Sequence, residues 1–360
     1  MRTELRPKSN CRSLLVACLI LGSALAWGNP TVHQKPKVKK PTPGGSTNVV
    51  MGTHQLAGEF GKFGTTYTIG KDSPLNFTLT GAEYRADRFV GTEPTGMTYS
   101  WVPDKTQKLL VIHYLVQNPL PREQNFTYQS WDFSAVSADE QNSKILNKPW
   151  IGSNAKYQDV SLKPGQKVAV TAAFFVPANG ETPKLIVQRG YDASAAVVRY
   201  DLRGKVAKLV APWSEDGTTT KEQVEMVPGG KYPLGGFDFT VASLEKASTP
   251  ANVEGPDASK DQWVLKFAMS GVAPEPARLW YGSLSVRVKT DDGDIVEISN
   301  YQRLLHASRD DVFDGQIPVG ETINVRMILE LPKGVTPKVL TILPIENEIQ
   351  RRAFIYKVGG

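Results

Sequence analysis

Residues 162–170 read LKPGQKVAV, and residues 317–325 read IPVGETINV. Both stretches run on to a hydrophobic residue followed by proline, and then to a Thr-Pro-Lys triplet at residues 182–184 and 336–338. The offset between the two copies is 155 residues, and it slips to 154 by the triplet. A repeat at this spacing in a chain of 360 residues predicts that a whole domain has been duplicated.

The pattern around the repeat predicts β-strands in both copies. Apolar residues alternate with other residues along 110–117 and again along 263–270, and a period of two is typical of strands. The 25 prolines and 31 glycines interrupt the chain throughout, as they do in all-β sandwiches. Within the quoted stretch Val325 falls on the packed phase and Asn324 on the wetter phase. The sequence therefore predicts an all-β protein of two tandem immunoglobulin-like β-sandwich domains.

A leader precedes these domains. Residues 1–26 contain several basic residues, an apolar run from Leu14 to Leu21 and the small-residue ending Ala24-Leu25-Ala26, which is the order of a secretory signal peptide. The run is shorter than the ~20 apolar residues that span a bilayer. We expect cleavage after Ala26, a secreted, periplasmic or extracellular location, and no transmembrane segment in the mature chain. The alternative is a lipoprotein whose anchor is attached at Cys18.

Residues 27–48 are rich in lysine and proline and predict a flexible linker. We expect the first sandwich over residues 49–203 and the second over residues 204–360, with the boundary in the polar segment that follows Leu202. The formal net charge is +6, but the leader contributes +3 and the linker +4, so residues 49–360 carry −1. A domain that binds nucleic acid is usually basic, so no nucleic-acid partner is expected.

No motif in the sequence indicates catalysis. A Gly-x-Ser-x-Gly elbow is absent, and Ser153–Lys156 and Ser243–Lys246 have the Ser-x-x-Lys spacing without its partner motifs. The four histidines have no metal-binding spacing, and both cysteines, Cys11 and Cys18, lie in the leader. The acidic run Asp291–Asp294 is predicted to be a hairpin turn rather than a calcium loop. We expect no enzymatic activity, no catalytic residue, no metal site and no cofactor.

One segment is a candidate for ligand binding. Residues 126–133 contain four aromatic residues, within a polar stretch from Asn118 to Lys156 that only the first copy carries. Exposed tyrosine and tryptophan rings bind sugars and proteins, whereas core packing is the alternative. Phe133 matches the apolar Leu284 of the second copy and is predicted to be core. Tyr128 and Trp131 lie on opposite strand phases and are the candidate ligand-binding residues, because function is often carried by loops added to a rigid scaffold.

The repeat resembles a known family. A strand start at Phe77 or Phe239, an alternating strand ending in Gln117-Asn118, and a Pro-Gly-Gln or Val-Gly-Glu turn before a strand that ends in proline are similar to telokin-like immunoglobulin-fold domains of bacterial secreted proteins and lipoproteins. The second copy departs from the pattern with Gly271 where Asn118 is expected. The resemblance implies immunoglobulin-like sandwiches and no general catalytic residues.

We therefore expect a non-catalytic binding or interaction protein, secreted or associated with the cell envelope, whose partner is a protein or a glycan. Two alternatives are an accessory domain pair of a cell-envelope enzyme and a structural spacer. Loss of binding after mutation of exposed aromatic residues favours the binding protein, and copurification with an enzyme favours the accessory pair.

Overall fold

β-strands make up most of the described part of the chain, which is all-β and has a β-sandwich fold. The computed structural model describes residues 51–56, 58–92, 98–144, 146, 150–151, 160–190, 192, 196–249, 251, 257–272, 277–298, 304–344 and 351–359. The expected leader, the linker and the Ser153–Lys156 motif lie outside these residues. In these ranges the helical structure is limited to a 3-10 turn at Tyr281–Ser283. Residues Thr47–Gly360 belong to one compact unit.

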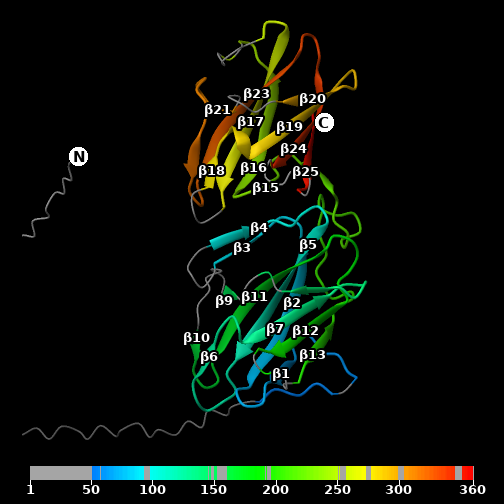
Figure 1. The fold of residues 1–360 in the computed structure, drawn as a ribbon, viewed down its shortest axis with the longest axis vertical. Helices are drawn as coiled ribbons and strands as arrows, with labels where there is room; N and C mark the ends of the chain where they lie inside the picture. The colour runs from blue at the N-terminus through cyan, green and yellow to red at the C-terminus, as the bar shows by residue number, and fades with distance from the viewer. Residues whose placement is uncertain are drawn as a thin grey trace, which may run out of the picture. The chain divides into compact units, whose positions relative to one another are not determined.

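Strands β1 to β13 form the sheets of the first half of the chain (Figure 1). The two large sheets have the orders β1-β2-β5-β11-β9 and β13-β12-β7-β8, and the small sheets are β10-β6 and β3-β4. The bounds are β1 Thr66–Ile69, β2 Leu75–Arg85, β3 Phe89–Thr92, β4 Thr98–Trp101, β5 Gln107–Gln117, β6 Gln124–Phe126, β7 Trp131–Val136, β8 Asn142–Lys144, β9 Trp150–Ile151, β10 Val160–Leu162, β11 Lys167–Pro177, β12 Lys184–Arg189 and β13 Val198–Asp201.

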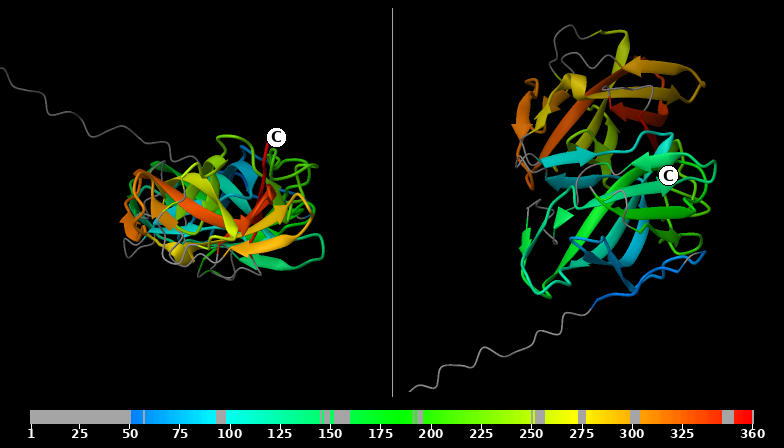
Figure 2. Two further views of the ribbon diagram at one scale, coloured as in Figure 1. Left: turned by 90° about the horizontal axis from the view of Figure 1, so that it is seen from above. Right: turned by 60° about the horizontal axis from the view of Figure 1, so that its bottom comes forward.

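Strands β14 to β25 form the sheets of the second half, and Figure 2 shows the two sets of strands from further sides. The large sheets have the orders β15-β16-β17-β23-β21 and β14-β25-β24-β19-β20, and the small sheet is β18-β22. The bounds are β14 Gln223–Glu225, β15 Tyr232–Leu234, β16 Phe237–Lys246, β17 Lys260–Gly271, β18 Ala277–Leu279, β19 Leu284–Thr290, β20 Ile295–Ile298, β21 Leu304–His306, β22 Gly315–Ile317, β23 Thr322–Pro332, β24 Pro337–Pro344 and β25 Ala353–Lys357.

The duplicated stretch forms the same turn and strand in both halves. Gly165 (φ +73°) and Gly320 (φ +81°) occupy equivalent left-handed positions before β11 and β23, where glycine costs nothing sterically. Asn118 exchanges backbone hydrogen bonds with this turn in the first half, and Gly271 does so in the second. A Cβ at Gly271 would lie 2.2 Å from the carbonyl oxygen of Pro318. The second copy therefore departs from asparagine here because its turn approaches the strand too closely for a side chain.

Each half has its own hydrophobic core, to which both of its large sheets contribute. In the first half Leu110, Ile112, Tyr114 and Val116 of β5 point into this core, as the period of two predicts. The largest fully buried side chains include Phe77, Tyr114, Phe126, Phe133, Phe174, Tyr200, Tyr232, Phe239 and Phe267. The acidic run Asp291–Asp294 forms a turn, with the Thr290 hydroxyl donating to the carbonyl oxygen of Asp294 at 2.9 Å.

In each half a segment that precedes the sandwich covers the edge of the last strand. The side-chain amide of Gln55 donates to the carbonyl oxygen of Arg199 in β13 (2.9 Å) and accepts from its N–H (3.0 Å), as a neighbouring strand would do. In the second half β14 pairs with β25 in parallel, Gln223 opposite Ala353 and Glu225 opposite Ile355. Covered edges offer no unpaired N–H and C=O groups to other chains.

Residues 204–220, which lead from β13 to β14, pack on the first half. Val206 and Leu209 are buried in its core. Ala207 donates to the carbonyl oxygen of Ala82 (2.8 Å) and accepts from the N–H of Tyr84 (2.9 Å). Most of these residues therefore pack on the first half, although the sequence predicted that the second domain begins at residue 204. Trp213 contacts both cores, and its ring centroid lies 6.0 Å from that of Tyr232 in the second half.

Arg88, in the first half, is buried (5% exposed) and makes hydrogen bonds to the second half. Its Nη2 donates to Asp238 Oδ1 (2.8 Å) and to the carbonyl oxygen of Phe237, and its Nη1 donates to the carbonyl oxygen of Gly235 (3.1 Å). Burial is the main influence on this guanidinium and lowers its pKa, which Asp238 partly offsets. A guanidinium suits this place because its rigid fork can satisfy several acceptors at once.

Arg352, in the second half, is buried (3% exposed) and makes hydrogen bonds to the first half in return. Its Nη1 donates to the carbonyl oxygen of Ala86 (2.9 Å), and its Nη2 donates to those of Gln107 (3.0 Å) and Asp104 (3.3 Å). Its Nε donates to the carbonyl oxygen of Lys221 at 2.7 Å. The two halves therefore meet at backbone carbonyl groups held by two reciprocal arginines, which we call the arginine pair.

Lys108 of β5 is a buried cation that forms no ion pair with any carboxylate in the part of the chain that the structure describes, although the more distant Asp216 and Glu181 favour its charge. Its ammonium donates to the carbonyl oxygens of Ala178 (3.3 Å), Gly180 and Thr218, and lies 4.5 Å from the centroid of the Tyr84 ring. Thr218 belongs to the segment that leads into the second half, so Lys108 ties this segment to β5. Burial lowers the pKa of Lys108 to about 8.

The stability of the protein is expected to rise between pH about 8 and about 9.5. The pKa of this lysine is lower in the folded chain than in the unfolded chain, where it is about 10.4, so the unfolded chain binds more protons in this window. Raising the pH removes these protons and destabilises the unfolded chain, so the free energy of unfolding increases. The window lies below the ordinary tyrosine pKa of about 10. Urea unfolding at several pH values measures the effect, and Lys108→Met should remove it. Lys205→Met, at an exposed position, is the control, and a rise that survives Lys108→Met would contradict the assignment.

Candidate functional site

The turn between β6 and β7 holds the candidate ligand-binding residues. Its shape is fixed by two hydroxyl groups: Ser130 Oγ accepts from the N–H of Thr127 (2.8 Å), and Thr127 Oγ1 accepts from the N–H of Gln129 (3.2 Å). Side chains of serine and threonine often replace backbone partners in such turns. Tyr128 lies at the tip, half-buried, with its hydroxyl accepting from Gln129 Nε2 at 2.9 Å.

Trp131 lies in the core rather than on the surface, which corrects the expectation that it could be exposed for a ligand. It is 5% exposed, and its ring meets that of Phe77 edge-on with centroids 5.4 Å apart. The period of two explains this position: Trp131 and Phe133 are two residues apart on β7 and share the inward face. The strand pairing also shows which residues correspond between the halves. Trp131 at the start of β7 pairs with Arg189, and Leu284 at the start of β19 pairs with Pro344, so Leu284 corresponds to Trp131 rather than to Phe133.

Arg189, at the end of β12, is a functional candidate that sequence reasoning missed. Its guanidinium carbon lies 5.6 Å from the centroid of the Trp131 ring. Nε donates to the carbonyl oxygen of Ser73 (3.1 Å), and Nη1 donates to that of Ser130. Burial lowers the pKa of Arg189, and the nearby Asp192 partly offsets this. In the first half Arg189 pairs with the aromatic Trp131. At the corresponding positions the second half has Pro344 opposite Leu284, so it has neither the arginine nor the aromatic ring.

A polar hollow of about 380 Å³ opens around this guanidinium, and we call it the Arg189 hollow. Three loops meet there, and the lining residues are Asp72, Ser73, Asn125, Thr127, Gln129, Ser130, Arg189, Gly190 and Asp192. Gly190 allows the close approach of two of these loops, because a Cβ there would lie 1.8 Å from the carbonyl oxygen of Gln129. The hollow thus contains one cation, two carboxylates, two amides and several hydroxyl groups, and Tyr128 lies in the same turn as its lining residues Thr127 and Gln129.

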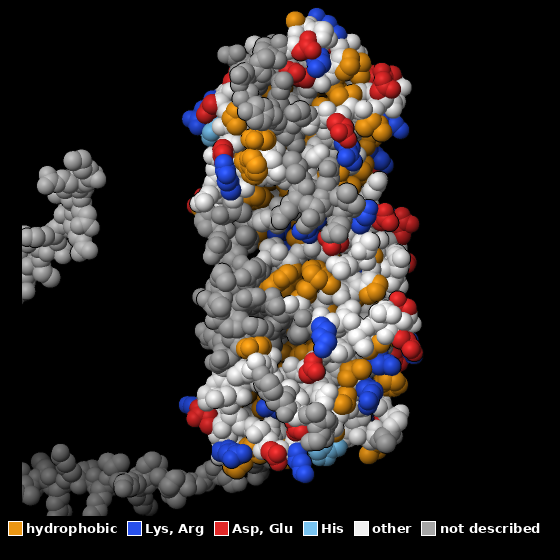
Figure 3. Space-filling view, viewed as in Figure 1, with side chains coloured by type: hydrophobic (Ala, Val, Ile, Leu, Met, Phe, Trp, Pro, Cys, Tyr) orange, Lys and Arg blue, Asp and Glu red, His pale blue; other side chains and the backbone are white. Residues whose placement is uncertain are grey.

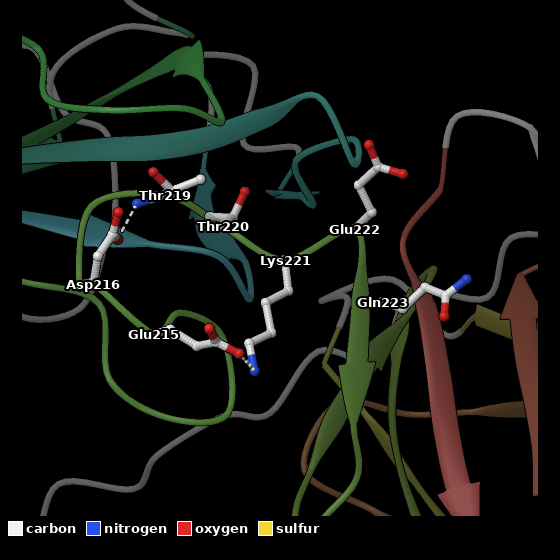
Figure 4. A pocket seen from close by; sticks show the side chains of 7 residues that line it. All are labelled: Glu215, Asp216, Thr219, Thr220, Lys221, Glu222 and Gln223. Carbon is white, nitrogen blue, oxygen red and sulfur yellow. Dashed lines mark hydrogen bonds and ion pairs between the residues drawn. The ribbon is translucent and has the colours of Figure 1, made fainter.

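A second hollow, of about 470 Å³, lies along the segment that connects the halves, from Glu215 to Gln223 (Figure 4). Three of its four charged side chains, Glu215, Asp216 and Lys221, already have partners. Lys221 Nζ lies 2.8 Å from a Glu215 oxygen, and Asp216 accepts from the N–H groups of Thr219 and Thr218 at 2.6 and 2.7 Å. These backbone hydrogen bonds hold the pKa of Asp216 well below its usual range. The second hollow is therefore explained by the structure of the connecting segment.

The other residues considered for chemistry do not form a site in the described ranges. Lys246 is ion-paired with Asp261 at 2.7 Å, so its ammonium is not held beside the Ser243 hydroxyl as a base. His113 Nδ1 lies 3.1 Å from Thr171 Oγ1 on a sheet face. No three His, Cys, Asp or Glu side chains among the described residues come together to hold a metal ion. On the face shown in Figure 3, basic and acidic side chains are interspersed.

Comparisons with known proteins give no functional assignment for this chain. No protein-family model matches the chain, and no curated protein matches it. An uncharacterized β-sandwich protein from Clostridium difficile 630 is similar at 13% identity over 41% of this chain and 99% of its own, with a TM-score of 0.28. The yjhA protein from Bacillus subtilis is similar at 13% identity over 36% of this chain and 97% of its own, with a TM-score of 0.24. Among the described residues, no helix has the length and apolar character needed to cross a membrane.

Proposed function

We propose that this chain is a non-catalytic binding protein, exported to the cell envelope or secreted, that binds its partner at the loop end of its first half. The observation that carries the proposal is the Arg189 hollow. Three loops of a rigid scaffold converge there on a guanidinium that lies over the Trp131 ring at 5.6 Å from its centroid, and binding sites are typically built from loops in this way. The second half lacks both residues at the equivalent positions, having Pro344 and Leu284 instead, as expected when one copy of a duplication acquires a function.

We propose further that the halves are tandem immunoglobulin-like domains of the telokin-like kind. The strands β2, β5, β7, β8, β9, β11, β12 and β13 can be named A, B, C, C′, D, E, F and G. The large sheets of the first half then contain A-B-E-D and G-F-C-C′, and those of the second half have the same order. This arrangement agrees with the immunoglobulin fold. The leader and linker of residues 1–48 support export, which a mature chain beginning at Trp27 would establish.

A structural spacer is the second candidate, and the arginine pair favours it. A joint fixed by buried arginines holds two domains at a set distance, which a spacer requires. The two candidates differ in what the Arg189 hollow does, because a spacer needs no ligand there.

Retention of a partner from an envelope extract tests the proposed function. The immobilised full-length protein is expected to retain a protein or glycan, and Arg189→Leu should lower the amount retained by about tenfold, as losing hydrogen bonds to a charged group typically does. Tyr128→Ala should weaken retention with a nearly unchanged melting temperature, because this ring is only half-buried. Lys205→Ala, exposed and outside the hollow, is the matched control. Equal retention by all three variants would remove the hollow as a binding site and leave the spacer.

A further inference from the structure

We infer that the Arg189 hollow takes a neutral, hydroxyl-rich ligand, an uncharged oligosaccharide. The inference rests on the proposed function and names the chemistry of the partner. Its basis is the set of charges and hydrogen-bonding groups that line the hollow.

The charges in the hollow disfavour a charged ligand. Arg189 contributes one positive charge, and Asp72 and Asp192 contribute two negative charges to the same lining. An anion would meet the two carboxylates, and a cation would meet the guanidinium, at a place where partial burial weakens solvent screening. A neutral hydroxyl group avoids both costs, because it can donate to the Asp72 carboxylate and accept from the guanidinium, while Asp192 also accepts from the N–H of Lys71 at 3.3 Å.

The hydrogen-bonding capacity left on Arg189 points to the same chemistry. Nε and Nη1 already donate to the carbonyl oxygens of Ser73 and Ser130. A carboxylate or phosphate is bound most strongly by two parallel N–H groups of one guanidinium, and here the Nε side of the fork is occupied. Nη2 has no partner among the described residues, so it can donate single hydrogen bonds, which suit hydroxyl oxygens.

The remaining polar groups and the adjacent ring suit a sugar. Asn125 and Gln129 bring amide groups, which can donate and accept, and Ser73 brings a hydroxyl group. Tyr128 extends from the same turn as Thr127 and Gln129, and a half-buried ring can pack on the apolar face of a pyranose. A volume of about 380 Å³ lies in the range of small-ligand pockets.

Titration of the ¹⁵N-labelled full-length chain with sugar oligomers of different charge tests the inference. The neutral probes are cellotriose, maltotriose and triacetylchitotriose, the anionic probe is trigalacturonate and the cationic probe is the glucosamine trimer. At least one neutral probe should shift the amide signals of residues 72–73, 125–130, 189–190 and 192 in a saturable manner. Both charged probes should bind at least about tenfold more weakly than the neutral probe. This is the effect expected from an unfavourable charge pair of about 1.4 kcal/mol.

Variants of the hollow separate charge selectivity from folding. Arg189→Leu and Arg189→Lys should both lose binding of the neutral probe, since lysine keeps the charge but not the fork. Asp72→Asn should keep that binding and raise the affinity for trigalacturonate, because it removes one of the two repelling carboxylates. The matched control is Asp139→Asn, which removes a carboxylate in the turn after β7 and should change neither affinity.

Two results would overturn the inference. The first is tighter binding of trigalacturonate or the glucosamine trimer than of every neutral probe. The second is the absence of signal shifts with all three neutral probes while an envelope extract still supplies a partner that depends on Arg189, in which case the ligand class is wrong and the proposed function stands. An extract partner that is indifferent to Arg189 would instead contradict the proposed function itself.

Discussion

Replacing Arg352 with methionine is expected to lower the free energy of unfolding by roughly 4 kcal/mol. The guanidinium donates to the carbonyl oxygens of Lys221, Ala86, Asp104 and Gln107, and methionine fills its space without satisfying any of them. Each buried acceptor left without a donor costs about 1–3 kcal/mol, and release of the buried charge offsets part of the sum. Urea unfolding followed by tryptophan fluorescence measures the loss.

Arg351→Met is the matched control for this variant. Arg351 is the neighbouring residue, its side chain is 24% exposed, it lies 3.6 Å from Asp104, and it donates one hydrogen bond to the carbonyl oxygen of Val102 at 3.1 Å. Its removal leaves one acceptor without a donor where that of Arg352 leaves four, and its ion pair is partly exposed, so the change should cost about 1–2 kcal/mol. If the two variants lost the same stability, the four carbonyl groups bound by Arg352 would contribute no more than the single one bound by Arg351, which would contradict the expected cost.

Replacing Val325 with aspartate is expected to unfold the second half. Val325 is 1% exposed, lies on the inward face of β23 and pairs with Phe267. An unpaired carboxylate at this position costs roughly 5 kcal/mol or more, which is of the order of the stability of a domain. Loss of the near-ultraviolet circular dichroism of the second half, together with a missing thermal transition, is the expected signature.

The adjacent residue provides the control. Asn324 is exposed on the other face of the same strand, so Asn324→Asp should change the free energy of unfolding by less than about 0.5 kcal/mol. Similar losses at both positions would show that β23 does not present alternate residues to the core and to the solvent.

The regular part of the fold was predictable because it repeats locally. The alternation along β5 and β17 and the Gly165 and Gly320 turns are short-range signals, and the duplication presents each of them twice. The inward position of Trp131 could also have been predicted from the sequence, since its spacing of two residues from Phe133 places both on one face of the strand.

The Arg189 hollow and the arginine pair could not be predicted from the sequence, because they depend on contacts between residues distant in sequence. Arg189 contacts Ser73 and Ser130 only after three loops have converged. Arg352 binds the carbonyl oxygen of Ala86, a group that every residue carries and that no sequence pattern can distinguish. For the same reason the packing of residues 204–220 on the first half was not visible in their polar composition.

The parallel pairing of β14 with β25 determines how the second half responds to mechanical force. β14 is its first strand and β25 its last, so tension applied to its two ends pulls these neighbouring strands past each other. In this shear geometry the hydrogen bonds between Gln223–Glu225 and Ala353–Ile355 share the load, whereas a hairpin pulled from its open end separates one bond at a time. Forced unfolding is governed by the rate of crossing that barrier rather than by equilibrium stability. The pairing that covers an edge strand therefore also makes the second half resistant to stretching.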